Sequence, residues 1–441
     1  MPATEGPPSI IMSSTIHKPI ESVAVIGLGY VGLPLALRLV AAGYKTLGLD
    51  LDQHKVDQIK QGNSYFEHID SVRIAEAVAS GSLDASTRFA DISTADAVII
   101  CVPTPLGEYR EPDLSYVLNS GRGIGPHIKR GALVVLESST YPGTTDEELR
   151  AVLEETSGLV AGEDFHLAYS PEREDPGNET HTLETIPKLV GGLTPACLER
   201  AVALYTPVVS KVHPVSSCRV AEAAKLLENI FRSVNIALVN ELKIVYGAMG
   251  VNIWEVIDAA ATKPFGFMRF APGPGWGGHC IPIDPFYLTW KARQYGHASR
   301  FIELAGEINI LMPAYVVQKA GDILNDKSLP LKGSRILLLG LAYKPNISDD
   351  RESPTYHIMA QLEAKGAQVA FHDPYIPVIP PTRAHAAYAG RKSSEISGDY
   401  DLLLLCTAHD AYKQLDFTAL DVPLLDTRNC VSRRPREYHQ A

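Results

Sequence analysis

The sequence predicts an α/β protein in which two doubly wound domains are joined by a long central helix and a helical middle domain. Three observations predict this fold class. Apolar, strand-like runs alternate with helical patterns over residues 20–205, and the same alternation returns at residue 334. Between them, residues 217–250 contain no proline and are apolar almost all round, as expected of a long buried helix. Strands that alternate with helices specify a parallel sheet covered on both faces.

These changes of pattern divide the chain into four segments. We predict a disordered extension over residues 1–20, an N-terminal Rossmann domain over 21–205, a central helical domain over 206–325 and a C-terminal Rossmann-like domain over 326–441. The last domain lacks a glycine fingerprint of its own. We expect the long helix to be buried between domains or in a subunit interface, which makes a homodimer the predicted assembly.

Composition excludes several classes of protein. The 441 residues carry a formal net charge of −11, which argues against nucleic acid or an anionic membrane as the main partner. Six scattered cysteines form no CxxC pair, as is usual in a reducing compartment, and they offer no metal site. The N-terminal stretch lacks the pattern of a secretory signal, and no apolar run is long enough to span a bilayer. We therefore expect a soluble, cytoplasmic protein.

A glycine-rich turn follows the first strand, in the run VAVIGLG, and opens the first helix. Its pattern, GxGxxG, permits a tight turn and lets a pyrophosphate approach a helix N-terminus closely. The residues that we expect to contact a dinucleotide here are Gly27, Gly29, Tyr30, Val31 and Gly32. Asp50 closes the second strand eighteen residues after Gly32, where a carboxylate accepts hydrogen bonds from a ribose and repels a 2′-phosphate. This combination favours NAD over NADP as the cofactor, and the turn by itself is also compatible with other ligands of Rossmann domains.

Two later strands end in turns at the same edge of the sheet. Thr104 lies in the turn CVPTP, and Thr140 follows the next apolar strand. Ligands bind at the carboxyl ends of parallel strands, so both threonines are candidate contacts on the nicotinamide side. A role in capping the helices that follow fits the local sequence equally well.

Four further stretches place reactive residue types on turns or on one helix face. They are YSPER (residues 169–173), KLLEN (225–229), GPGWGGHCIPIDP (273–285) and KPNISDDRESP (344–354). In the second stretch, Lys225 and Asn229 share a helix face because they are four residues apart. In the third, Cys280 stands among glycines and prolines, four residues before Asp284. A cysteine by itself is more often a small buried hydrophobe than a nucleophile.

Together and in this order behind the GLGYVG turn, these stretches resemble the nucleotide-sugar dehydrogenase family, the UDP-glucose and UDP-N-acetylhexosamine 6-dehydrogenases. The similarity runs from about residue 22 to 430, and GGHCxPxDP is far more specific than a glycine fingerprint. The resemblance implies oxidation of a sugar primary alcohol to a carboxylate with two NAD molecules, and a C-terminal domain that binds the UDP-sugar.

The resemblance also implies roles for individual residues. Cys280 would attack the aldehyde, and the resulting thiohemiacetal would lose a second hydride to give a thioester. Lys225, Asn229 and Asp284 would handle the C6 hydroxyl proton and stabilise the developing oxyanion, and Glu172 would activate water for hydrolysis. Further substrate contacts implied are Arg173, Arg269, Gly277 and Lys344, with Arg351 and Lys55 on the cofactor.

The identity of the sugar depends on finer features. Ile283 stands where many UDP-glucose enzymes carry a lysine, and the run after Glu172 is Arg-Glu-Asp-Pro-Gly, without their Phe-Leu. The stretches ESSTYPGTT, TKPFGF and GGHCIPIDPFYLTWKARQYG are most similar to the branch that acts on UDP-N-acetylglucosamine. UDP-N-acetylmannosamine, UDP-GalNAc and UDP-glucose are the alternative substrates.

Two other functions share parts of this pattern. A hydroxy-acid dehydrogenase that removes only two electrons would keep the fold but would have no use for Cys280. A nucleotide-sugar sensor without turnover would keep the fold but need not retain Cys280, Lys225, Asn229, Asp284 and Glu172. We therefore expect an enzyme.

Overall fold

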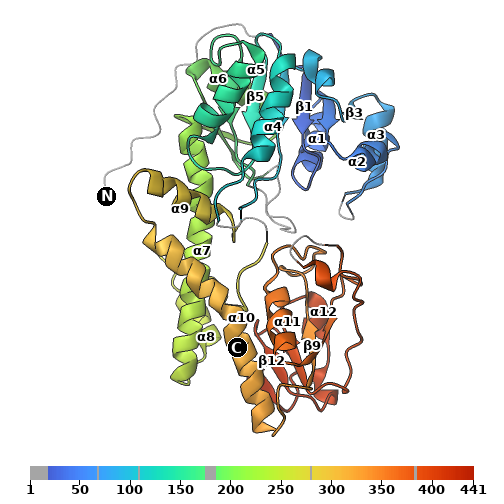
Figure 1. Cartoon of the computed structure of the whole chain (residues 1–441), viewed down its shortest axis with the longest axis vertical. Coiled ribbons are helices and arrows are strands. Elements are labelled where there is room, and N and C mark those ends of the chain that lie inside the picture. Colours follow the sequence, from blue (N-terminus) through green and yellow to red (C-terminus); the bar gives the residue numbers. More distant parts are fainter. Residues whose placement is uncertain (1–17, 67–68, 108–109, 174–184, 279–280, 382–384) are drawn as a thin grey trace. The chain divides into compact units, whose positions relative to one another are not determined.

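The computed structural model describes residues 18–441 except 67–68, 108–109, 174–184, 279–280 and 382–384 (Figure 1). Most of the predicted N-terminal extension, residues 1–17, lies outside the described residues. The chain divides into two compact units, residues 1–226 and 227–441.

The first unit is built on an eight-stranded sheet of order β3-β2-β1-β4-β5-β6-β7-β8. Its neighbouring strands are parallel except for β6 and β7, which pair antiparallel. The chain order reverses between β1 and β4, which makes that point of the carboxyl edge the expected ligand site. The strands are β1 (Ser22–Ile26), β2 (Lys45–Leu49), β3 (Leu83–Ser86), β4 (Ala97–Ile100), β5 (Leu133–Leu136), β6 (His166–Tyr169), β7 (Lys188–Gly192) and β8 (Val212–Val215).

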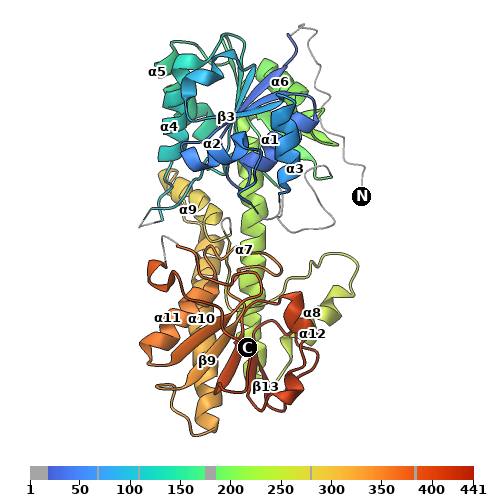
Figure 2. The same cartoon turned by 90° about the vertical axis from the view of Figure 1, so that its right-hand side faces the viewer.

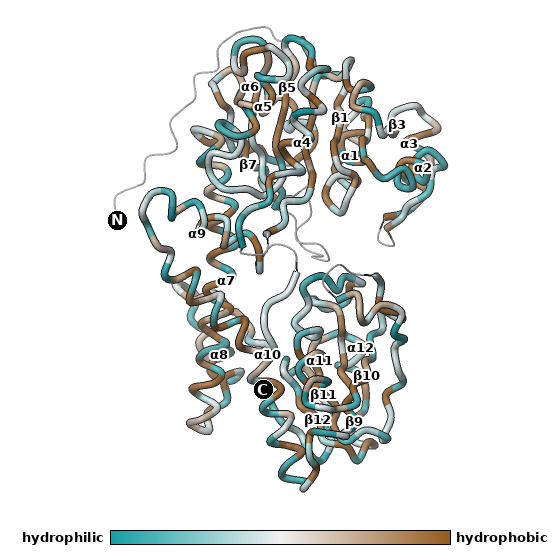
Figure 3. The backbone as a smooth tube through the Cα atoms, viewed as in Figure 1, coloured by the Kyte–Doolittle hydropathy of each residue, from teal (hydrophilic) through white to brown (hydrophobic). Residues whose placement is uncertain are grey.

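Helices cover both faces of this sheet. They are α1 (Gly32–Ala41), α2 (Gln53–Lys60), α3 (Ser71–Ala79), α4 (Ser115–Ile124), α5 (Arg150–Ser157) and α6 (Pro195–Tyr205). Alternate residues of β1 point to opposite faces: Val23 and Val25 pack with α1, α3 and α6, whereas Ala24 and Ile26 pack with α4 and α5. Hydrophobic residues accordingly run along β1 and β5 in Figure 3.

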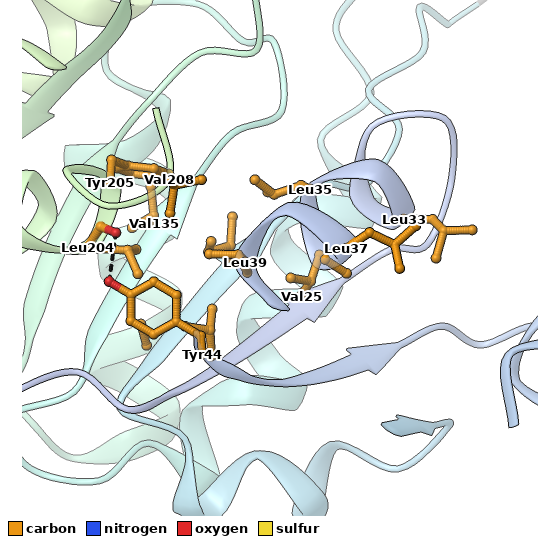
Figure 4. Packing of buried hydrophobic residues seen from close by; sticks show 14 of the residues in the cluster. Val25, Leu33, Leu35, Leu37, Leu39, Tyr44, Val135, Leu204, Tyr205 and Val208 are labelled. Carbon is orange, nitrogen blue, oxygen red and sulfur yellow. Dashed lines mark hydrogen bonds between the residues drawn. The ribbon is translucent and has the colours of Figure 1, made fainter. Parts of the chain in front are cut away.

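The core on the α1 side is shown in Figure 4. The leucines of α1 fall on its buried face, including Leu35 and Leu39. The Tyr44 hydroxyl donates to the carbonyl of Leu204 at 2.9 Å, so the polar end of this buried ring is satisfied (Figure 4). Burial of this kind, at about 25 cal/mol per Å² of apolar surface, dominates the stability of such a domain.

The long apolar stretch forms one helix, α7 (Cys218–Ala248), which runs from the first unit into the second. In the second unit it lies beside α10 (Arg300–Asp326), as Figures 1 and 2 show. Asn240 of α7 donates to Asn309 of α10 at 2.8 Å, and both side chains are buried. The shorter helices α8 (Ile253–Ala261) and α9 (Asp284–Gln294) complete the helical middle.

The second unit ends in a five-stranded parallel sheet of order β10-β9-β11-β12-β13. The strands are β9 (Arg335–Leu339), β10 (Gln368–His372), β11 (Leu402–Leu405), β12 (Leu424–Asp426) and β13 (Tyr438–Gln440). One face packs on α10 and α11 (Pro354–Ala364), and the other packs on residues that include Tyr412 of α12 (Asp410–Gln414). The predicted fold class, two doubly wound α/β domains around a helical middle, is confirmed.

Candidate active site

The glycine turn after β1 has the geometry that a dinucleotide phosphate requires. Gly27 has φ +91°, and a side chain there would lie 2.7 Å from the carbonyl oxygen of Cys101. A Cβ on Gly32 would lie 1.8 Å from the Gly27 carbonyl, so the helix packs directly on the turn. A Cβ on Gly29 would meet no atom of the described residues within 4 Å, which leaves room for a ligand at the middle of the turn. Gly27 thus permits the tight turn, Gly29 leaves room for a phosphate, and Gly32 allows the helix to pack closely on the turn.

Asp50, at the end of β2, holds this turn in place. Its Oδ2 accepts from the Leu28 amide at 2.9 Å and from the Lys55 ammonium at 3.0 Å. The Tyr65 hydroxyl donates to the Leu28 carbonyl at 2.6 Å, and burial together with Asp50 raises the pKa of Tyr65. We expected both Lys55 and Asp50 to lie beside the ribose. In the structure, the Lys55 ammonium contacts the Asp50 carboxylate.

Other members of the predicted cofactor set surround this turn. Tyr30 is half-exposed, and its ring lies 4.4 Å from that of Phe66. Val31 is the residue immediately before α1. Thr104 donates to the Ser139 carbonyl at 2.8 Å and so ties the loops after β4 and β5 together. Thr140 is buried, and its hydroxyl has no hydrogen-bond partner among the described residues, which leaves a polar group at this edge of the sheet for a ligand.

A buried charged cluster lies at the carboxyl edge of β5 and β6. The Lys188 ammonium is 2.9 Å from Glu137 and 3.6 Å from Glu172. The Tyr205 hydroxyl donates to the other oxygen of Glu137. Burial opposes the charge of Lys188, but Glu137 and Glu172 outweigh it and raise its pKa to about 12.

The neighbours of this cluster respond to the same burial. Burial raises the pKa of the Glu137 carboxyl, with Lys188 acting in the opposite direction. Burial, with Glu137 next in effect, also raises the pKa of the Cys101 thiol. Sequence reasoning missed Glu137, Lys188 and Tyr205. The available signal was a carboxylate directly after the apolar strand ALVVL, a costly place for an unpaired charge.

Glu172 and Arg173 lie in the loop that follows β6. The Glu172 Oε1 accepts from the Arg173 amide at 2.6 Å, and the Arg173 guanidinium donates to the Pro187 carbonyl at 2.7 Å. The loop that carries Glu172 is thereby fastened to the start of β7.

Helix α7 carries the predicted pair Lys225 and Asn229. Lys225 is buried, with 9% of its surface exposed. The Asn229 amide donates to the Asp284 carboxylate at 2.6 Å, and Asp284 is buried as the first residue of α9. Two predicted residues that are far apart in sequence therefore meet.

The glycine-rich loop before Cys280 packs on the segment that contains Lys344 and Arg351. A Cβ on Gly277 would lie 2.8 Å from Tyr343, and Gly278, at φ +87°, donates its amide to the Arg351 carbonyl at 3.2 Å. Side chains at either glycine would push these segments apart. Cys280 itself lies outside the described residues.

The remaining predicted residues make local contacts. Lys344 is half-buried, and the exposed Arg351 pairs with Asp349 at 2.6 Å. Arg269 is exposed and pairs with Asp258 at 2.8 Å. Within the described part of the chain, no hydrogen bond or ion pair joins Arg269 to another predicted site residue.

The residues that the structure describes contain neither a metal-site cluster nor a membrane-spanning helix. No group of three or more His, Cys, Asp or Glu side chains there has the arrangement of a metal site. No helix in that part of the chain is both long and apolar enough to cross a membrane.

Comparison with known proteins gives the family. The chain matches the UDP-glucose/GDP-mannose dehydrogenase family in its NAD binding domain (residues 21–209), its central domain (219–310) and its UDP binding domain (337–433). A UDP-N-acetyl-D-glucosamine 6-dehydrogenase of Pseudomonas aeruginosa is 37% identical, over 89% of this chain and 92% of the relative.

Two further proteins are similar over nearly their full length. An NDP-N-acetyl-D-galactosaminuronic acid dehydrogenase of Ralstonia nicotianae is 35% identical, over 96% of this chain and 99% of the relative. The solved structure of a UDP-D-ManNAc dehydrogenase from Pyrococcus horikoshii superposes with a TM-score of 0.86 at 31% identity, covering 95% of this chain and 98% of that chain. With NAD as its cofactor and a UDP-sugar as its substrate, the chain belongs to the UDP-glucose/GDP-mannose dehydrogenase family and is an NAD-dependent nucleotide-sugar dehydrogenase.

Proposed function

We propose that this dehydrogenase oxidises the C6 primary alcohol of UDP-N-acetylglucosamine to the uronic acid, a four-electron reaction that proceeds through a thioester on Cys280. The contact that carries the proposal is the 2.6 Å hydrogen bond from Asn229 to Asp284. It fastens the residue four places after Cys280 to the helix that bears Lys225. A nucleophile needs such fixed neighbours, because small displacements of reacting groups are costly in rate.

Bound NAD would supply the hydride acceptor for each of the two oxidations. The residues that would hold it are the turn Gly27–Gly32, Asp50 and the two threonines, Thr104 and Thr140. The room at Gly29 and the hydroxyl of Thr140, neither of which meets a partner among the described residues, support this assignment.

The chain's own groups would supply the remaining chemistry. Asp284, with Lys225 and Asn229, would take the proton of the C6 hydroxyl and stabilise the oxyanion that follows. The Cys280 thiolate would attack the aldehyde carbon, forming the C–S bond of a thiohemiacetal. Glu172 would take a proton from the water that displaces Cys280 from the thioester.

The choice of sugar rests on sequence similarity. The relatives named above act on N-acetylated amino sugars, according to their names. The relative named for UDP-N-acetyl-D-glucosamine and the motif forms ESSTYPGTT and GGHCIPIDP both favour that substrate. UDP-N-acetylmannosamine, UDP-GalNAc and UDP-glucose are the alternatives.

The experiment is an assay of NAD reduction with UDP-Glc, UDP-GlcNAc, UDP-GalNAc and UDP-ManNAc. We expect the highest kcat/KM with UDP-GlcNAc and two NADH for each sugar consumed. A ratio of one would contradict the thioester route, and a preference for another sugar would contradict the substrate assignment while leaving the route intact.

A variant of the proposed nucleophile tests the route directly. Cys280→Ser should lose nearly all formation of acid, because an unactivated serine hydroxyl adds poorly to the aldehyde and so does not readily form the hemiacetal that the second oxidation requires. The matched control is Cys430→Ser, at a half-buried thiol in the segment that follows β12, which should retain activity. Turnover of Cys280→Ser at the wild-type rate would assign Cys280 a structural role.

We further propose that the enzyme is a cytoplasmic homodimer. The support for the dimer is a set of exposed apolar side chains on α7. The support for the location is the scattered, unpaired cysteines among the described residues.

A further inference from the structure

We propose that Lys188 is a positioning residue that holds the Glu172 carboxylate for thioester hydrolysis, as the middle member of a buried Glu137–Lys188–Glu172 chain. This inference rests on the proposed role of Glu172 as the base that activates water.

The reversal of one strand places Lys188 at the active edge of the sheet. Strands β1, β4, β5 and β6 all end at the carboxyl edge, but β7 runs antiparallel to β6. Gly191 pairs with Tyr169 and Gly192 with Ala168, so the first residue of β7, Lys188, lies beyond the end of β6. A residue that opens a strand therefore sits where the catalytic side chains of such sheets gather.

Each polar or aromatic group around Lys188 comes from a different element. Glu137, which follows β5, has a carboxylate oxygen 2.9 Å from the Lys188 ammonium. Glu172, which follows β6, has one 3.6 Å from it. The ring of Tyr205, on α6, lies 5.2 Å from the ammonium, and the Cys101 thiol follows β4 and interacts electrostatically with it. With both carboxylates ionised and Lys188 protonated, the chain of three carries a net charge of −1.

The exposed fractions of Glu137, Lys188 and Glu172 distinguish a buried structural pair from a carboxylate that can take part in catalysis. The Lys188 side chain is 5% exposed and that of Glu137 is 0% exposed, so these two form a closed pair, further held by the Tyr205 hydroxyl. The Glu172 side chain is 16% exposed, so it is the member that solvent and substrate can reach. A buried pair alone adds little to stability, whereas a pair that extends to a third, accessible carboxylate fixes the position of that group.

A second tether acts on the same loop. The Arg173 guanidinium donates to the carbonyl of Pro187, the residue before Lys188. The start of β7 thus holds Glu172 through its ammonium and through its backbone. In the hydrolytic step the water oxygen bonds to the acyl carbon, the C–S bond breaks, the Cys280 thiolate leaves, and Glu172 takes the water proton. Lys188 acts by keeping the accepting carboxylate in place.

The test measures which step slows. Lys188→Met should lower kcat by about a hundredfold, the cost of misplacing a catalytic group. The KM for the sugar should fall together with kcat, because an enzyme that accumulates a covalent intermediate is saturated at lower substrate concentration, so kcat/KM should change little. Because both oxidations precede hydrolysis, the variant should show a rapid burst of two NADH per subunit, followed by a slow phase. Intact-mass measurement of the quenched enzyme should show the sugar acyl adduct. A uniform loss of rate without burst or adduct would overturn the proposal.

Further variants guard against misfolding. If Lys188→Met does not fold, the double variant Lys188→Met/Glu137→Gln removes both charges of the closed pair and should show the same burst. Lys188→Arg should recover part of the slow phase. The matched control is Lys129→Met, which removes the lysine of the Lys129–Asp96 pair at the opposite edge of the same sheet and should show no burst.

Glu172→Gln distinguishes the two proposals. If it accumulates the adduct and the Lys188 variants do not, the role of Lys188 is wrong and that of Glu172 stands. If neither accumulates it, the assignment of Glu172 as the base fails, and the inference fails with it.

Discussion

At the cofactor turn, both carboxylate oxygens of Asp50 already have partners within the protein. Oδ2 accepts from Leu28 and Lys55, and Oδ1 accepts from the Asp52 amide at 3.0 Å. The side chain is 12% exposed, so a part of it still faces solvent. Asp50 thus shapes the turn, and Lys55 is a cation held close to the position expected for the ribose.

This pair gives a prediction about cofactor choice. Asp50→Ser should raise the KM for NAD by about tenfold or more, because hydrogen bonds to a charged group contribute about 1.5–3 kcal/mol. It should also raise kcat/KM for NADP relative to NAD, since the released Lys55 can attract a 2′-phosphate. Steady-state kinetics with both cofactors measure this ratio. Asp57→Ser, a change to an exposed aspartate of α2, is the control. An unchanged KM for NAD would contradict a role for Asp50 at the ribose.

Among single residues, those in sequence-local motifs were predictable, and those brought in by topology were not. The glycines of the turn and the motif GGHCIPIDP can be recognised from the sequence alone. The contact of Asn229 with Asp284 was implied only by family resemblance. Lys188 was not predictable, because nothing in KLVGG shows that this strand runs opposite to its neighbour.

At the scale of elements, the first strand of each domain, β1 and β9, is followed by a turn of the same geometry. Gly340 after β9 has φ +93°, and its amide donates to the carbonyl of His372, as Gly27 donates to Leu49. Leu341 then donates to Asp373 at 2.7 Å, as Leu28 does to Asp50. The turn therefore forms without a GxGxxG pattern, which the sequence alone could not indicate.

The second copy of this turn differs in the partner of its carboxylate. Asp373 is fully buried and lies 3.1 Å from His409, whose other ring nitrogen accepts from the Asn346 amide. Hydrogen bonds from His409 and from backbone amides outweigh burial and lower the pKa of Asp373. Asp373 therefore fixes the loop before Lys344.

Helix α7 contains a second buried lysine, which has no carboxylate partner among the described residues. Lys243 donates to the Gly273 carbonyl at 3.0 Å, and its ammonium lies 5.5 Å from the Tyr315 ring. The Gly273 amide in turn donates to Asn240 at 2.9 Å. Two residues of α7 thus fasten the start of the glycine-rich loop. Burial, together with Arg428, lowers the pKa of Lys243 to about 7.

The lowered pKa predicts a pH dependence of stability. Between about pH 7 and the ordinary value of 10.5, the unfolded chain holds a proton on Lys243 that the folded chain has released. The free energy of unfolding contributed by this group therefore rises with pH across that window, by about 1.4 kcal/mol per pH unit at most. The difference in the free energy of unfolding, Lys243→Met minus wild type, should therefore be more positive at about pH 6 than at about pH 9.

Urea denaturation at the two pH values measures this difference. The lost hydrogen bond to Gly273 costs about 1 kcal/mol at either pH and cancels from the comparison. Lys365→Met, at an exposed lysine of α11's C-terminus, should show no such pH dependence. A constant difference between Lys243→Met and wild type would show that Lys243 keeps its proton on folding.

At the scale of the molecule, the fold class followed from the alternation of strands and helices, but which residues of α7 are exposed did not. We expected so apolar a helix to be buried between domains or in a subunit interface, and in the single chain Leu227, Phe231, Leu238 and Val245 are each 46–66% exposed. Their spacings of four, seven and seven residues place them on one side of the helix. The opposite side, with Ser233, Ala237 and Asn240, is buried in the second unit. An exposed apolar stripe of this length indicates a surface that another protein covers.

We expect a second copy of the chain to cover this stripe. Sedimentation velocity should give about twice the chain mass of 47.9 kDa, and Leu238→Asp should shift the protein to the monomer, because a charge buried in an apolar interface without a partner costs several kcal/mol. Val160→Asp, at an exposed valine of the first unit, should leave the dimer intact. A wild-type monomer over the whole concentration range would contradict the dimer. A dimer that survives Leu238→Asp would move the interface away from the α7 stripe, and the same measurement on Phe231→Asp would decide whether any part of that stripe is used.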